Sequence, residues 1–119
     1  MRVNFDTLIG LTITEIVNNC DKELTFHTKE GRTFYMYHEQ DCCENVYLAD
    51  TGGDLKDVVG EPVLSAEKSS NNDPPLEDRD CESCTWTFYR LATNRGSICL
   101  RWFGESNGYY SEGVDFEEL

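Results

Sequence analysis

The chain has 119 residues, enough for one domain with a single hydrophobic core. Its 23 acidic and 10 basic residues give a net charge of −13, which repels nucleic acid and acidic membranes and attracts basic partners. No apolar run approaches the roughly 20 residues that span a membrane, and the first residues lack an apolar signal-peptide core. We therefore expect a cytoplasmic protein without a membrane-spanning segment.

The first third of the chain predicts a short helix followed by strands. Asn4 is placed to cap the helix and Gly10 to end it. Residues 11–17 then alternate with a period of two, with Leu11, Ile13 and Val17 on one parity and Thr12, Thr14 and Ile16 on the other. Tight turns separate three such stretches and predict an antiparallel meander over residues 11–17, 23–28 and 33–37.

The middle of the chain contains shorter elements and more breaks. Residues 46–49 predict a strand, and residues 54–60 predict a second short helix, with Asp54 as its cap and Gly60 at its end. Residues 62–66 are typical of an edge strand. Residues 69–80 are rich in Ser, Asn and Asp and hold two adjacent prolines, which predicts an exposed acidic loop.

The last third predicts two strands, over residues 85–91 and 97–103, joined by a turn. The pair Asn107-Gly108 indicates a hairpin into a final strand that runs through Phe116. We assign four aromatic residues to the core: Trp86, Phe88, Trp102 and Phe116. The whole chain, residues 1–119, therefore predicts a single β-dominated α+β domain, with one antiparallel meander and hairpin sheet of about seven strands and two short helices.

Acidic residues are concentrated in the middle of the sequence. Between Glu39 and Glu82 there are thirteen acidic and three basic residues, a net charge of −10. Such a segment either keeps a small protein soluble or forms a surface that attracts a basic partner.

Residues 37–44, Tyr-His-Glu-Gln-Asp-Cys-Cys-Glu, hold an imidazole, three acids, a carboxamide and two thiols directly after a predicted strand. In an enzyme, Cys42 or Cys43 would be the nucleophile and His38 its base. The surrounding carboxylates oppose this chemistry because they raise the pKa of a thiol. We therefore favour a site without a catalytic residue, and without a signal peptide we expect free thiols.

Cysteines also raise the question of a metal. Cys81 and Cys84 form a CxxC pair that Cys42 and His38 could complete as a tetrahedral zinc site. Adjacent cysteines rarely share one ion, and no second CxxC is present. We therefore expect neither a metal nor another cofactor.

The region from Arg101 to Ser111 combines a cation, four aromatic residues and several hydrogen-bonding groups. This composition is typical of a pocket for a nucleotide-like ligand and equally of a protein-interface hot spot. Joined with the block at residues 37–44, it gives the predicted ligand-binding residues: His38, Gln40, Asp41, Arg101, Ser106, Asn107, Tyr109 and Tyr110.

Three blocks of the sequence resemble a family of small phage and prophage proteins, a domain of unknown function. These blocks are residues 37–44, Thr-Trp-Thr-Phe-Tyr at 85–89, and Arg-Trp-Phe-Gly through Tyr-Tyr-Ser-Glu at 101–112. The resemblance implies a phage accessory protein, and small acidic proteins of that origin are often inhibitors of host machinery, including immunity.

We therefore expect a phage-encoded, non-enzymatic binding protein that inhibits a host factor of antiviral defence, acting in the host cytoplasm on a protein with a basic surface. A sponge that sequesters a small nucleotide signal is the alternative, and a Cys/His enzyme is the second. Direct nucleic-acid binding and membrane association are not expected, whereas a homodimer formed through unpaired sheet edges is reasonable. The position of Arg101 distinguishes the first two functions. An Arg101 that is exposed and faces the His38 block favours capture of a small ligand. An Arg101 that is buried in a salt bridge favours binding of a protein through the acidic surface.

Overall fold

The computed structural model describes residues 1–71, 83–106 and 111–119. Eight strands and two short 3₁₀ helices follow one another in this part of the chain. In order they are η1 (Phe5–Leu8), β1 (Ile13–Asn19), β2 (Glu23–Thr28), β3 (Thr33–Tyr37), β4 (Asn45–Asp50), η2 (Leu55–Val58), β5 (Ser65–Asn71), β6 (Ser83–Ala92), β7 (Ser97–Ser106) and β8 (Asp115–Glu118).

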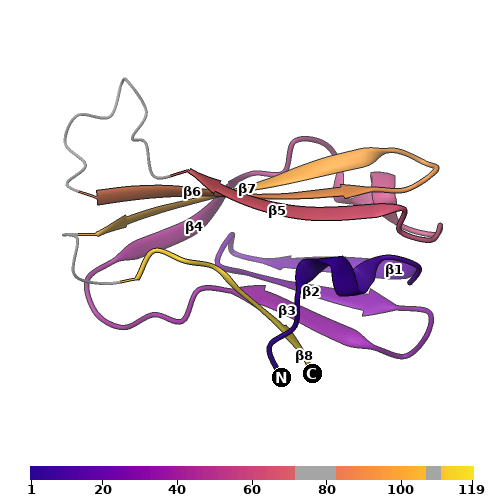
Figure 1. Ribbon diagram of the computed structural model, residues 1–119, viewed down its shortest axis with the longest axis horizontal. Helices are drawn as coiled ribbons and strands as arrows, with labels where there is room; N and C mark the ends of the chain where they lie inside the picture. Colours follow the sequence, from indigo (N-terminus) through magenta and orange to yellow (C-terminus); the bar gives the residue numbers. More distant parts are fainter. Residues whose placement is uncertain (72–82, 107–110) are drawn as a thin grey trace.

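The strands form two antiparallel sheets packed face to face (Figure 1). The first sheet has the order β1-β2-β3-β8 and the second the order β4-β7-β6-β5. The predicted β-dominated antiparallel fold and the opening meander are confirmed, but the prediction of one sheet of about seven strands is wrong. The facing sides of the two sheets carry the apolar residues, which are buried where the sheets pack against each other.

The chain passes between the two sheets twice. The first crossing segment, residues 38–44, leads from β3 to β4, and the second crossing segment, residues 111–114, leads into β8. Residues 107–110, and with them the predicted Asn107-Gly108 turn, lie outside the described residues. A hairpin between β7 and β8 is nevertheless wrong, because β7 pairs with β4 and β6, whereas β8 pairs with β3.

The core lies between the sheets and receives residues from every strand. Trp102 and Phe116 belong to it, as predicted. The hydroxyl of the buried Tyr89 donates to the carbonyl oxygen of Val114 at 3.2 Å, which ties the second sheet to the segment before β8. Trp86 and Phe88 were expected in the core and are not; they alternate with Tyr89 and point to the opposite face of the second sheet.

A bulge in β1 changes which residues face inward. The pairing with β2 shifts between Ile13 and Glu15, so that Ile16 lies opposite the buried Phe26 and packs against the core. Val17 has the same parity as the buried Ile13 but lies beyond the bulge, and it is 42 % exposed. The extra residue of a bulge inverts the alternation beyond it, which parity counting does not anticipate.

The short helices and the edge strand also differ in detail from expectation. Both helices are single 3₁₀ turns, one capped by the carboxylate of Asp54, which accepts from the backbone N–H of Lys56. The other begins after Asn4, whose side chain makes no capping hydrogen bond. The edge strand is β5, which begins at Ser65 and not at residue 62 as predicted. It continues to Asn71, so residues 69–71, which were predicted to begin the exposed loop, belong to this strand. Residues 72–80 of the predicted acidic loop lie outside the described residues.

Helices in the described ranges are all too short and too polar to cross a membrane.

Candidate functional site

The first crossing segment is organised around one buried carboxylate, that of Glu44, whose side chain is fully buried. It accepts hydrogen bonds from the backbone N–H groups of Cys42 at 2.8 Å and Asp41 at 3.0 Å. The side-chain amide of Gln40 donates to the same carboxylate at 3.1 Å and to the Glu44 carbonyl at 2.7 Å. His38 Nε2 lies 2.9 Å from Glu44 Oε2. The carboxylate therefore holds the segment in a closed loop.

These donors keep Glu44 ionised. Burial alone would raise the pKa of the carboxyl, but hydrogen bonds from the Cys42 backbone and the His38 side chain outweigh it and lower the pKa to about 2. The imidazole of His38 is 4 % exposed, and its Nδ1 atom lies 2.6 Å from the carbonyl oxygen of Gly113.

A second buried carboxylate organises the second crossing segment. Glu112 accepts hydrogen bonds from the hydroxyls of Thr85 at 2.7 Å and Ser106 at 2.5 Å. Burial opposes ionisation, but the hydroxyls of Ser106, Ser83 and Thr85 hold the pKa of Glu112 below its usual value. These residues belong to β6 and β7, so this carboxylate fastens the segment to the second sheet.

The predicted ligand-binding residues therefore divide into separate groups. The polar atoms of His38 and the amide of Gln40 are engaged within the first crossing segment, and the hydroxyl of Ser106 is engaged by Glu112. Asp41 is exposed and lines, with His38 and Gln40, an open cavity of about 480 Å³. Asn107, Tyr109 and Tyr110 lie outside the described residues.

Arg101 lies apart from this cavity and is not among its lining residues. It is on β7, on the outer face of the second sheet, with 44 % of its side chain exposed. Its guanidinium pairs with Asp50 at 3.4 Å and lies over the indole of Trp86, 5.3 Å from the ring centroid. Arg101 thus neither faces the His38 block nor is buried in its salt bridge.

Around Arg101, aromatic side chains form a continuous group on the outer face of the second sheet. Phe103 lies 4.8 Å from Trp86 and 5.9 Å from Tyr47, measured between ring centroids, and Phe88 lies 6.4 Å from Trp86. Strand register explains the grouping, because Phe103 is opposite both Trp86 and Tyr47, and Arg101 is opposite Phe88. We call this group the outer patch: Tyr47, Trp86, Phe88, Arg101 and Phe103.

The cysteines do not form the predicted set of free thiols. Cys42 and Cys43, whose Cα atoms are 3.7 Å apart, are joined by a disulfide, and Cys84 is also disulfide-bonded. Cys20 and Cys99 are free.

The two cysteines of the zinc alternative that fall in the described ranges, Cys42 and Cys84, are therefore not available as thiolates. Cys81 lies outside the described residues. Across residues 1–71, 83–106 and 111–119, no group of three or more His, Cys, Asp or Glu side chains is arranged to hold a metal ion.

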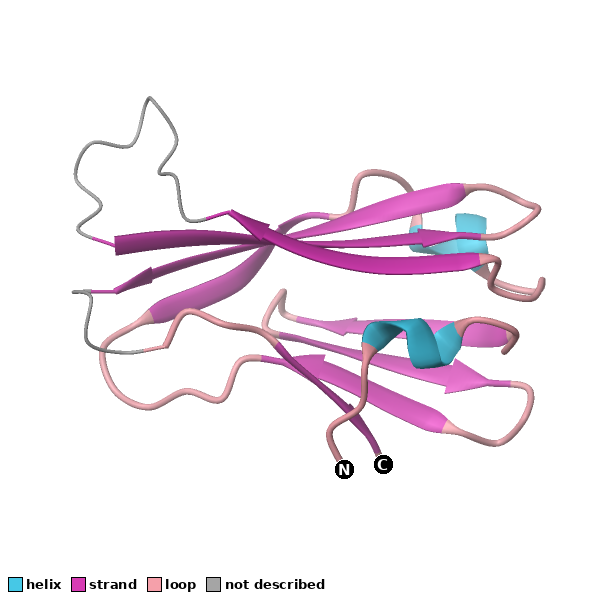
Figure 2. Ribbon diagram, in the orientation of Figure 1, coloured by secondary structure: helices cyan, strands magenta, loops and turns pink. Residues whose placement is uncertain are grey.

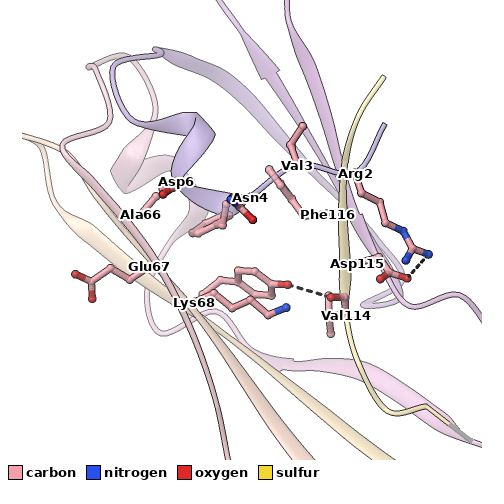
Figure 3. A pocket seen from close by; sticks show the side chains of 12 residues that line it. Arg2, Val3, Asn4, Asp6, Ala66, Glu67, Lys68, Val114, Asp115 and Phe116 are labelled. Atoms are coloured by element: carbon pink, nitrogen blue, oxygen red, sulfur yellow. Dashed lines mark hydrogen bonds and ion pairs between the residues drawn. The ribbon is translucent and has the colours of Figure 1, made fainter.

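A further cavity, of about 600 Å³, opens where the two sheets part, between β5 and β8 (Figure 3). The N-terminal residues Arg2 and Asn4 lie on one side of it and Lys68 on the other (Figure 3). The ammonium of Lys68 lies 5.6 Å from the centroid of the Tyr89 ring. None of the predicted ligand-binding residues within the described ranges lines this cavity.

Sequence reasoning overlooked the two residues that organise the crossing segments. Glu44 has the same parity as Val46 and the buried Leu48, and Glu112 has the same parity as Val114 and Phe116. Each glutamate thus extends the inward-facing row of the strand that follows it. An acid in such a row is a recognisable signal for a buried, hydrogen-bonded carboxylate.

The model of a domain of unknown function, DUF7448, matches residues 6–116 of the chain. No curated protein and no solved structure matches it.

Proposed function

The chain belongs to the DUF7448 family, a domain of unknown function, and we propose that it is a non-enzymatic binding protein whose acidic surface engages a basic protein. The charge distribution carries the proposal. Residues 39–71 contain eight acidic and two basic residues. Six of those acids are exposed, namely Glu39, Asp41, Asp50, Asp54, Asp57 and Glu67. Such a field accelerates the approach of a basic partner and repels anions.

The arrangement of the His38 block supports binding over catalysis. A cysteine nucleophile needs a free thiolate beside a base with an available nitrogen. The sulfurs of Cys42 and Cys43 are bonded to each other, and both nitrogens of His38 contact oxygen atoms of other residues. The Cys/His enzyme is therefore the least supported of the three expected functions.

The proposal in its full form is a phage-encoded inhibitor of a host factor of antiviral defence, acting in the host cytoplasm. The phage origin rests on the resemblance of the three sequence blocks, and the inhibitory role on what that resemblance implies. The charge supports only the choice of a basic target.

The test is the salt dependence of partner binding. The protein is used to capture partners from host cells, and the association rate of the recovered protein is then measured at low and high salt. We expect the rate to fall by at least about tenfold, because salt screens exposed charges over a Debye length of about 30 Å at 0.01 M and about 3 Å at 1 M. A partner that is not basic, or a rate that does not depend on salt, would contradict the proposal.

Two variants with equal net charge show whether the salt-dependent association rate depends on the acidic segment or only on the net charge of the protein. The first replaces three exposed carboxylates of the acidic segment: Glu39→Gln, Asp41→Asn and Glu67→Gln. The control replaces three carboxylates elsewhere: Asp6→Asn, Glu15→Gln and Glu117→Gln. We expect the first variant to lose most of the salt-dependent rate and the control to keep it. Equal losses would mean that only the net charge matters.

A second candidate function is the sequestration of a small nucleotide signal. The observation that favours it is the stacking of Arg101 on Trp86, because an aromatic ring beside a guanidinium can hold a base and a phosphate. The test is a thermal-shift screen of nucleotides. At a concentration 100 times the dissociation constant, a bound nucleotide would stabilise the fold by about 2.7 kcal/mol. If no nucleotide stabilises the fold, nucleotide sequestration is excluded as a function.

A further inference from the structure

The outer patch lies on the outer face of a sheet whose other face already carries the core. Tyr47, Trp86 and Phe88 are partly exposed there, whereas Phe103 is buried among them. Tyr89 and Trp102 face inward from β6 and β7 and are 1 % exposed. Trp86 and Phe88 have the opposite parity on β6, together with the exposed Arg90. The core does not require aromatic residues in these positions. Their clustering therefore calls for another explanation.

The composition of the outer patch is that of a protein-interface centre. Tyr, Trp, Phe and Arg are the residues enriched at the buried centres of interfaces, and they account for most large losses of affinity on truncation. Side chains in and beside the patch already contact one another: Arg101 lies over Trp86, and the neighbouring Arg90 lies over Phe88, 5.6 Å from the ring centroid. These contacts restrict the side chains before binding, so that less conformational freedom is lost when a partner arrives.

The surroundings of the outer patch select the class of partner. Glu67 and Glu105 have the outward parity on β5 and β7. A register shift in β4 places Asp50 opposite Arg101, with which it forms an ion pair, so three carboxylates accompany the rings. Carboxylates and the faces of Trp, Tyr and Phe both attract lysine and arginine side chains. A nucleotide or a second copy of this chain would instead meet the field of a molecule with a net charge of −13.

We propose that the outer patch is the contact centre for a basic protein, which places lysine or arginine side chains on its rings and against the surrounding carboxylates. The inference rests on the proposed function, since it names the surface through which that binding occurs. It also moves the site away from the His38 block, whose polar groups hold the two crossing segments together.

The experiment compares capture by the full chain and by matched variants. Trp86→Ser and Phe88→Ser each remove a ring from the outer patch. Tyr35→Ser is the control. The ring of Tyr35 is half-buried and stacks on Tyr37, with 4.7 Å between the ring centroids, on the outer face of the first sheet. This substitution therefore removes an aromatic ring from the side of the molecule opposite the outer patch. Circular dichroism verifies the fold of each variant. The affinity of each is then measured for the basic protein that the unmodified chain captures.

We expect each outer-patch variant to lose at least about 30-fold in affinity, the effect of removing one hot-spot residue, and Tyr35→Ser to stay within about threefold. Equal affinity for all three variants would overturn the outer patch as the contact centre and leave the proposed function standing. Failure of the unmodified chain to bind any basic protein would overturn the proposed function, and the inference with it. If one of the two outer-patch variants does not fold, the affinity of the other tests the inference.

Discussion

His38 and Gly113 lie 75 positions apart in the chain, and the imidazole Nδ1 of one is 2.6 Å from the carbonyl oxygen of the other. Each residue belongs to one of the two crossing segments. The same ring contacts the buried carboxylate of Glu44 through its other nitrogen. A single side chain therefore joins both passages between the sheets and connects them to the carboxylate that closes the first one.

We expect His38→Ala to destabilise the fold by about 1–3 kcal/mol, because it removes one donor from the buried Glu44 and leaves the Gly113 carbonyl without its side-chain partner. The measurement is the free energy of unfolding in urea. His27→Ala is the matched control, since His27 is half-buried on β2 and its side chain makes no recorded polar contact within the described ranges. Equal effects of the two substitutions would show that the His38 contacts do not contribute.

Stability is expected to fall in acid in a way that depends on Glu44. The pKa of this carboxyl is about 2 in the folded protein, against an ordinary value of 4.5. The folded state therefore binds this proton less readily than the unfolded state, so the stabilisation is complete above about pH 4.5 and is lost as the pH falls towards 2.

Urea midpoints measured across that pH range check this prediction. Glu44→Gln should flatten the decline without abolishing it, because the pKa values of Asp50, Glu112 and Glu118 are lowered as well. Glu39→Gln, at an exposed position of the same segment, should leave the decline unchanged. A decline as steep in Glu44→Gln as in the unmodified chain would contradict the role given to Glu44.

Gly104→Ala should destabilise the fold by about 1–3 kcal/mol through overpacking. A Cβ atom at this position would lie 2.8 Å from the carbonyl oxygen of Glu112 and 2.9 Å from its Cβ, so the second crossing segment would have to move. Gly113→Ala is the control, since its nearest contact would be the Ser111 hydroxyl at 3.4 Å. Thermal unfolding of both variants is the measurement. If Gly104→Ala is no less stable than the control, the close approach is not required.

The two tryptophans should differ in their accessibility to a quencher. Trp102 is 1 % exposed, and its indole N–H donates to the sulfur of Met36, whereas Trp86 is half-buried on the outer face. Acrylamide should therefore quench the Trp102→Phe variant, which retains Trp86, several-fold more strongly than the Trp86→Phe variant. Trp102→Phe also leaves the bulk of the core ring in place, so both proteins should fold. Equal quenching would place Trp86 in the core.

Local alternation predicted most of the strands, but it could not predict how they are shared between two sheets. The apolar period of β1, β2 and β3 is visible in the sequence, and so is that of β6 and β7. The pairing of β8 with β3 is a contact between distant segments, and nothing near Phe116 encodes it. The Asn107-Gly108 pair favoured a local hairpin instead, whereas β7 pairs with β4 and β6 and β8 pairs with β3.

The candidate site was predicted less completely, because residue type alone does not reveal whether a polar group is already satisfied. Functional-looking residues such as His38 and Gln40 make their hydrogen bonds within the fold. Trp86 and Phe88 were assigned to the core by hydrophobicity, although the parity of Arg90 on the same strand indicated the outer face. Glu44 was recognised as an acid and not as the centre of the segment, because two of its donors are backbone groups of a loop whose conformation the sequence does not specify.

The two ends of the chain lie side by side at the edge of the first sheet, remote from the outer face of the second (Figure 2). Met1 exchanges backbone hydrogen bonds with Glu118, and Arg2 bridges to Glu117. A purification tag, a fluorophore or a fused module at either end would thus emerge on the side away from the outer patch. The molecule can be immobilised by either terminus with Trp86 and Phe88 facing solution, and a peptide linker between the ends would permit circular permutation.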